Sequence, residues 1–315
     1  MASICASVEY NKNMEGMQLL SRQLRKVALA ILASAMCFEV ASGQNCPLPG
    51  ILALIREDFP DKPALVAMYT RYLASDGSTN PACDIGVSFP SRSALSWVNQ
   101  LQGIEPPGGK QTSYFSIADI QSNIATDRSL GVEWIYYDLE GGLSPDSEVS
   151  DPINSINQAA TIVHNAGLKF AFTVVNVGRH PRDIVPHVVA NAKAYNPQGQ
   201  SFIQQGCSVY ASEVGQVMIL AKQHNPSLRL WAQLSLLRGT VETNEQCLTQ
   251  LIDYLAQRGY LLDAVTVFYR LDSNHVALLD QFYQWYTQRY RSSRTGALFR
   301  IERATGNVCA GCVRS

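Results

Sequence analysis

The chain has 315 residues, of which 46% are hydrophobic and 9% aromatic, and it carries 25 basic and 26 acidic side chains. A net charge of −1 without a basic stripe argues against nucleic acid or an anionic membrane surface as a partner. This length and composition predict a soluble globular protein with one large domain.

The N-terminal segment has the features of a secretory signal. A basic region and an apolar run precede small residues that suit a signal peptidase: Arg22, Arg25 and Lys26, then Val27–Phe38, then Ala41–Gly43. The apolar run is too short to cross a bilayer as a mature helix. We therefore expect residues 1–43 to be removed and residues 44–315 to be secreted or periplasmic, without a membrane span.

The predicted mature chain of 272 residues is long enough for one (β/α)8 barrel. It keeps six cysteines, an even number that suggests disulfides in an exported protein: Cys46, Cys83, Cys207, Cys247, Cys309 and Cys312. We interpret the pair at 309 and 312 as structural rather than as a redox or metal site, because no second ligand pair lies nearby in the sequence. Cysteines near both ends of the mature chain are expected to staple the domain.

From residue 62 onward, short apolar runs alternate with helical patterns, which predicts parallel strands joined by crossover helices. There are eight candidate strands, the number that a closed barrel needs: Leu65–Tyr69, Ile85–Phe89, Val132–Asp138, Leu168–Val174, Ser201–Gln205, Arg229–Leu234, Ala264–Tyr269 and Ala297–Ile301. We predict a single (β/α)8 TIM barrel. An open doubly wound sheet is the alternative, but no G-x-G-x-x-G follows a strand.

Several helices have recognisable ends. Asp151 and Pro152 open one of them, which stops before Gly167. The others are expected from about Ser208 to His224, from about Thr243 to Gly259 and from Asn274 to about Tyr290. Segments 103–113 and 176–187, rich in Gly, Pro and charged residues, are predicted to be loops.

The stretch Gly131–Gly142 carries the strongest functional signal, because an aromatic strand there delivers two acids to a Gly-Gly stop. Alternate side chains of a strand share a face, so Tyr136, Asp138 and Glu140 point the same way, with the carboxylate stems roughly 7 Å apart. Buried charge is costly without a purpose, and barrel enzymes collect chemistry at strand ends. We read both acids as catalytic; the alternative is that Asp138 caps the next turn and Glu140 is solvated.

Polar and aromatic residues also follow other predicted strands. We expect five of them to line a substrate site: Tyr136, Asn176, Gln205, Gln233 and Tyr269. Amides, acids and aromatic faces suit sugar hydroxyls, although many small polar ligands would accept the same set. We predict a carbohydrate ligand or substrate, with no metal and no other cofactor, since the histidines are scattered.

Glycoside hydrolysis needs one carboxylic acid to protonate the leaving oxygen and a second group to stabilise the oxocarbenium-like centre. Glu140 is the candidate acid, and Asp138 would raise its proton affinity by like-charge repulsion. A nucleophile or base from another strand would be Glu302 or Asp272. A substrate-assisted mechanism would instead use an acetamido group of the sugar, oriented by the aspartate.

The segment Glu133–Glu140 resembles the D-x-x-D-x-D-x-E strand of chitinase-like family 18 glycoside hydrolases. The resemblance implies a barrel in which Glu140 is the proton donor and Asp138 orients the acetamido group. Glu133 and Tyr136 stand where that family has its first two aspartates. We therefore predict a secreted glycoside-hydrolase-like enzyme; the alternative is a degenerate, non-catalytic barrel that binds carbohydrate or peptide, because loss of the acid at Tyr136 is how such a site would decay.

Overall fold

The computed structural model describes residues 109–269, 273–286 and 288–289, and the backbone of short strands at 50–51, 53–54 and 87–89. The strands are β1 (Gly50–Ile51), β2 (Ala53–Leu54), β3 (Val87–Phe89), β4 (Lys110–Tyr114), β5 (Val132–Glu140), β6 (Lys169–Val175), β7 (Ala194–Tyr195), β8 (Arg229–Ser235) and β9 (Ala264–Phe268). The helices are α4 (Ile117–Ser129), α5 (Asp146–Ser150), α6 (Pro152–Asn165), α7 (Pro181–Val188), the 3-10 turn η2 (Val189–Asn191), α8 (Gln200–Ile203), α9 (Cys207–His224), α10 (Val241–Ala256) and α11 (Ser273–Tyr286).

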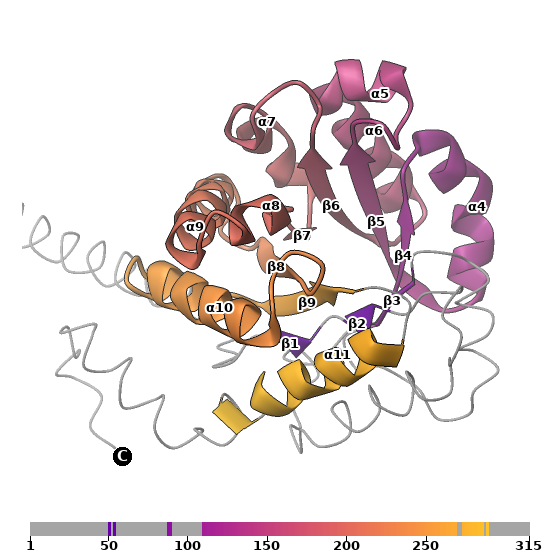
Figure 1. Ribbon diagram of the computed structural model, residues 1–315. Coiled ribbons are helices and arrows are strands. Elements are labelled where there is room, and N and C mark those ends of the chain that lie inside the picture. The colour runs from indigo at the N-terminus through magenta and orange to yellow at the C-terminus, as the bar shows by residue number, and fades with distance from the viewer. Residues whose placement is uncertain are drawn as a thin grey trace, which may run out of the picture. The chain divides into compact units, whose positions relative to one another are not determined.

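Strands β4 to β9 are hydrogen-bonded neighbours in chain order, and each pair runs parallel. Parallel neighbours need a crossover connection, and helices supply it outside the curled sheet (Figure 1). The predicted α/β class with a parallel sheet is therefore confirmed. The described strands form a half-barrel, at whose edges β1 pairs with β9 and β2 with β3.

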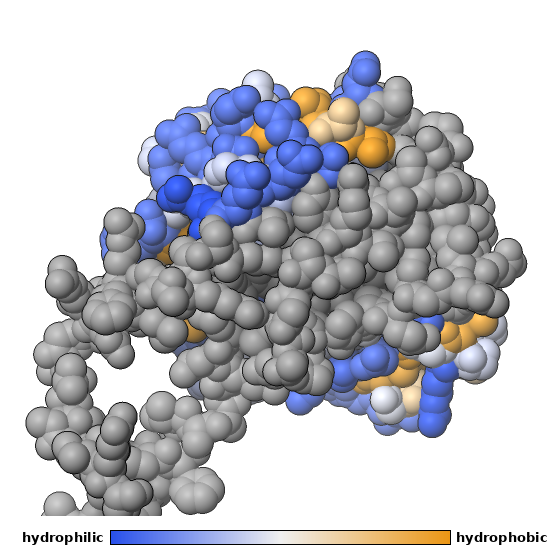
Figure 2. All heavy atoms as spheres, turned by 90° about the horizontal axis from the view of Figure 1, so that it is seen from below, coloured by the Kyte–Doolittle hydropathy of each residue, from blue (hydrophilic) through white to orange (hydrophobic). Residues whose placement is uncertain are grey.

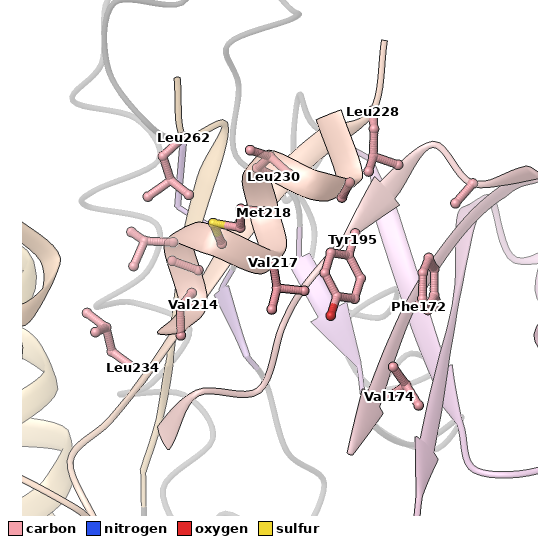
Figure 3. Close-up of a cluster of buried hydrophobic side chains, with 14 of the residues drawn as sticks. Phe172, Val174, Tyr195, Val214, Val217, Met218, Leu228, Leu230, Leu234 and Leu262 are labelled. Carbon is pink, nitrogen blue, oxygen red and sulfur yellow. The ribbon is translucent and has the colours of Figure 1, made fainter. Parts of the chain in front are cut away.

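The outer face of the sheet is apolar and packs against the helices. Alternate residues of β6 point outward, and the Phe172 ring lies 4.9 Å from the Tyr195 ring, centroid to centroid. Figure 3 shows these side chains in one buried cluster with residues of β6, α9, β8 and the segment before β8: Val174, Val214, Val217, Met218, Leu228, Leu230 and Leu234. Each fully buried side chain of this size contributes about 1.5–3 kcal/mol, so this cluster holds the crossovers against the strands.

The inner face is filled at its amino end by aromatic rings. The rings of Trp134 and Trp231 lie 5.3 Å apart, and the cations of Lys169 and Arg229 lie over Trp134 at 5.2 and 5.7 Å. This packing occupies the lower part of the interior. Towards the carboxyl ends of β5 and β6, the inner face carries the polar residues Thr173, Asp138 and Glu140.

Most helix boundaries agree with the sequence patterns. The Asp151 side chain caps α6 by accepting from Asn154 N, with Pro152 in the first turn, as predicted. Helices α9, α10 and α11 begin within two residues of the expected starts. The predicted strands Leu65–Tyr69 and Ala297–Ile301 lie outside the described residues, as do the predicted signal segment and the cysteines at 46, 83, 309 and 312.

Three local predictions were wrong. Residues 201–205 are not a strand: α8 covers Gln200–Ile203, and the strand that enters the sheet is the two-residue β7. The predicted loop 103–113 contains most of β4, whose Thr112 hydroxyl bonds to the buried Asp127 of α4. The predicted loop 176–187 contains most of α7, which is capped by His180.

The exposed large apolar side chains of the described chain are scattered: Phe115, Leu143, Leu261 and Leu278. On the face in Figure 2, the coloured residues are largely hydrophilic, with small apolar groups between them. Among the described helices, none has both the length and the apolar character needed to cross a membrane.

Candidate functional site

A tight turn fixes the end of β5, where the two acids lie. The carbonyl of Glu140 accepts from Leu143 N at 3.1 Å and from Ser144 N at 2.8 Å. The Ser144 hydroxyl accepts from Glu140 N at 3.0 Å and donates to the carbonyl of Asp138 at 3.2 Å. Ser144 thus closes the turn, and the Asp138 side chain is left for another role.

The glycine directly after Glu140 has a steric reason. A Cβ on Gly141 would lie 2.0 Å from the backbone oxygen of Asn176, so the ends of β5 and β6 meet backbone to backbone. Asn176 has a φ of 55°, in the left-handed region that few residues other than glycine adopt. The predicted site residue Asn176 therefore lies beside the turn that follows the two acids, where its side chain is exposed.

The two acids share one amide. Gln198 Nε2 donates to Asp138 Oδ1 at 3.0 Å, and the Gln198 side chain also bonds to Glu140. Burial, followed by the negative charge of Glu140, raises the pKa of Asp138 to about 7. Burial also raises the pKa of Glu140, and the hydrogen bond from Gln198 lowers it in part. Near neutral pH the pair can hold one proton, most readily on Asp138.

Tyr136 lies one step deeper on the same face, as predicted. Its pKa is raised well above the ordinary value, first by burial and then by the charge of Asp138, while Thr173 and Asn196 lie against its hydroxyl. Thr173 stands beside Asp138 in the β5–β6 register. The floor beneath the acids is therefore made of neutral hydroxyl and amide groups.

Two buried amide oxygens on the inner face have no hydrogen-bond partner, Asn196 Oδ1 and Gln233 Oε1, and the Thr173 hydroxyl of the floor has none either. Gln233 was predicted as a site residue, and it shares the inner face of β8 with Trp231, two residues earlier. Unpaired buried polar atoms are uncommon in folded proteins, so each calls for an explanation. A ligand with hydrogen-bond donors would satisfy both amide oxygens.

The structure does not bring the other two predicted residues to this site. Gln205 is exposed in the turn after α8, because the expected strand is a helix. Tyr269 is 1% exposed and belongs to the apolar cluster behind the sheet. The residues that sequence reasoning missed are Thr173, Asn196 and Gln198.

The lysines of the described chain do not follow the carboxyl ends of the strands, whereas Arg179 follows β6 and has an exposed side chain. Lys110 and Lys169 begin β4 and β6, at the opposite end of the sheet, while Lys193 precedes β7 and Lys222 belongs to α9. In the same part of the chain, no group of three or more metal-ligating side chains is assembled. The chemistry offered by the described site is that of two carboxyl groups and neutral hydrogen-bonding groups.

No protein-family model matches the chain, and no curated protein matches it by sequence. A decarboxylase acting on 3-keto-L-gulonate 6-phosphate from Vibrio cholerae aligns over 75% of this chain and 98% of its own, with 9% identity and a TM-score of 0.43. The tryptophan synthase alpha chain of Legionella pneumophila aligns over 77% and 93%, with 12% identity and a TM-score of 0.45. The aldolase QR15 aligns over 76% and 96%, with 8% identity and a TM-score of 0.45.

The predicted resemblance to family 18 glycoside hydrolases is wrong, and with it the assignment of glycoside hydrolysis and its degenerate carbohydrate- or peptide-binding alternative. The matched structures are a decarboxylase, a synthase and an aldolase. The geometry agrees with this correction. Glu133, in the first acid position, forms an exposed ion pair with Lys169 at 2.8 Å, away from the site. In the second position, Tyr136 is neutral, and Gln198 supports Asp138 in place of an acid.

Proposed function

We propose that the sheet closes into a complete eight-stranded (β/α)8 barrel. β1 pairs with β9, and β2 pairs with β3 at the opposite edge. A single residue, Leu52, separates β1 from β2, so the nine assigned strands become eight when these two are counted as one. β1 and β2 together would then join both edges and place the ends of the described strands around one mouth.

We propose further that the chain is an acid–base enzyme that moves a proton on a small hydroxylated carbonyl compound. The observation that carries this proposal is the carboxyl of Asp138, with a pKa of about 7, next to Glu140 at the carboxyl end of the sheet. A catalytic group works best when its pKa is near the working pH, and parallel barrels place chemistry at this end.

The two acids have different roles in this proposal. Asp138 holds its proton more tightly than an ordinary aspartic acid, so it is the acid, and Glu140 is the base. The Glu140 carboxylate takes a proton from the carbon next to the substrate carbonyl. The electron pair of that C–H bond forms the C=C bond of an enol, and the carbonyl oxygen takes the proton of Asp138. The reverse steps return both protons.

The unpaired acceptors support this choice of substrate class. Asn196 Oδ1 and Gln233 Oε1 require donors, which substrate hydroxyl groups would supply. The Tyr136 hydroxyl beneath the acids is neutral, so it suits an uncharged carbonyl compound. A hydroxy-ketone or hydroxy-aldehyde fits these groups.

The test follows carbon-bound protons by NMR. Small hydroxy-ketones, hydroxy-aldehydes and keto acids would be incubated with the chain in D2O at pH 7, and loss of the signal next to the carbonyl would be measured. Carbon–carbon cleavage or decarboxylation would appear as new signals in the same spectra. Glu140→Gln is expected to abolish exchange, and Asp138→Asn to slow it by about 10²-fold. Asp253→Asn, the same chemical change on exposed α10, is the matched control.

Exchange no faster than in buffer, for every compound, would overturn the proposal. So would exchange that persists unchanged in Glu140→Gln. The rate should also fall as the pH rises through 7, because Asp138 then loses the proton that it donates.

Export of the chain is a separate proposal. A disulfide joins Cys207 at the start of α9 to Cys247 in α10, and such bonds persist in oxidising compartments. N-terminal sequencing of the protein recovered from the periplasm or medium of an expressing cell should begin near residue 44. A chain that stays in the cytosol with an intact N-terminus would contradict this proposal.

A further inference from the structure

The loop after β7 is buried although it has no regular secondary structure. Asn196, Pro197 and Gly199 are buried, and Gln198 between them is partly exposed. The loop stays hydrogen-bonded to the sheet, because Asn196 N donates to the carbonyl of Phe172 at 3.1 Å. The fixed φ of Pro197 removes further freedom. Gln198 is therefore presented by a constrained segment.

Packing against α9 fixes the other end of the loop. A Cβ on Gly199 would lie 2.1 Å from Val214 Cγ2 and 3.1 Å from the ring of Tyr210, so the backbone lies directly on the helix. The Tyr210 hydroxyl in turn donates to the carbonyl of Gln233 at 3.0 Å. The loop is thus held between β6, α9 and β8, and a side chain on such a support keeps a defined position.

The Gln198 amide meets both acids. Its Nε2 donates to Asp138 Oδ1 at 3.0 Å, across 60 residues of sequence, and its side chain also bonds to Glu140. An amide nitrogen carries two hydrogens, so one glutamine can serve two carboxyl groups. Because such bonds favour the ionised form of a carboxyl group, the amide opposes the effect of burial on the pKa of Glu140.

We propose that Gln198 is the positioning residue of the acid pair: its amide holds Asp138 and Glu140 in fixed orientation, so that one proton resides on a defined carboxyl group. This inference rests on the proposed function, because the pair needs one acid and one base. Among the described residues, the titratable group that acts on Asp138 is Glu140, on the same strand. Its neighbour on β6, Thr173, is uncharged.

The experiment measures titration and does not depend on turnover. Chain labelled with carbon-13 at the aspartate carboxyl groups would be titrated by NMR, with the Asp138 signal identified from Asp138→Asn. Gln198→Met keeps the length of the side chain but removes the amide donors. It should raise the proton affinity of Asp138 by about tenfold, since a hydrogen bond to a charged group is of that order.

Two further variants make the result specific. Gln216→Met is the same change on α9, where the glutamine bonds to Ser212, and it should leave the Asp138 titration unchanged. Gln198→Asn keeps a polar side chain but is one methylene shorter, so it should raise the proton affinity of Asp138 in the same direction. This variant carries the test if Gln198→Met does not fold.

An unchanged Asp138 titration in a folded Gln198 variant would overturn the inference, whatever the activity. A shifted titration without any proton exchange by the wild type would support the role of Gln198 and overturn the proposed function instead. If exchange does occur, the fall of its rate at high pH should move upward in Gln198→Met together with the titration of Asp138.

Discussion

Asp138→Asn should stabilise the protein at alkaline pH, although it removes a group of the proposed active site. Burial and Glu140 raise the pKa of Asp138 from 3.8 to about 7, a rise of about three units. Each unit corresponds to about 1.4 kcal/mol, so the ionised carboxylate costs the fold about 4 kcal/mol at most. Because the side chain is not completely buried, we expect about 2–4 kcal/mol.

The sign follows from the protons bound by each state. Between pH 4 and 7 the folded protein keeps the proton of Asp138, whereas the unfolded chain has released it. The favourable contribution of this group is therefore complete below about pH 4 and is lost as the pH rises through about 7. Asparagine does not titrate, and its carbonyl oxygen can still accept the hydrogen bond from Gln198.

Urea unfolding at pH 4.5 and at pH 8.5 would measure the effect. The free energy of unfolding of Asp138→Asn should exceed that of the wild type by about 2–4 kcal/mol at pH 8.5, and by only about 1 kcal/mol at pH 4.5. Asp253→Asn on the exposed face of α10 is the matched control and should show no such pH-dependent gain. An Asp138→Asn variant that is destabilised equally at both pH values would refute the reasoning.

Three further predictions concern the elements around the site. Gly199→Ala should lower the free energy of unfolding in urea by about 1–3 kcal/mol, because its Cβ would lie 2.1 Å from Val214 Cγ2. Adding Val214→Ala to the same chain should restore part of this free energy. Asn244→Asp should lower the free energy of unfolding at pH 7 by about 3 kcal/mol or more, because it puts a carboxylate against three carbonyl groups that now accept hydrogen bonds from Asn244 Nδ2. The melting temperature should fall accordingly, and an unchanged melting temperature would contradict this prediction. Joint replacement of Cys207 and Cys247 by alanine should cost about 3–4 kcal/mol in urea unfolding, since their disulfide closes a loop with a sequence separation of 40; equal stability would show that the bond is dispensable.

The long, strongly patterned elements could be predicted from the sequence. β5 combines an apolar run with a Gly-Gly stop, and α6 combines an Asp-Pro start with a regular apolar stripe. In both, the local pattern and the tertiary packing favour the same structure. Strand geometry alone predicts that the side chains of Tyr136, Asp138 and Glu140 share one face of β5, and in the structure they do.

The short elements could not be predicted, because their local pattern is weak and contacts elsewhere decide their structure. β7 has only two residues, Ala194 and Tyr195, which is too few for an alternating pattern. β4 carries polar residues whose partners are supplied by α4, such as Asp127, which accepts from Thr112 at 3.0 Å. Propensity is a weak guide where such partners decide the conformation.

The acid pair shows why a motif predicts which strand end the two acids reach but not their chemistry. The spacing of Asp138 and Glu140 on one strand requires only that both reach the same edge of the sheet. Their proton affinities depend on burial and on Gln198, which arrives from a loop 60 residues later in the chain. The sequence Asn196-Pro-Gln-Gly199 is recognisable as a turn, but turn residues do not reveal which side chain meets which acid. The same two acids can therefore support different reactions, and the choice lies with residues that the motif does not contain.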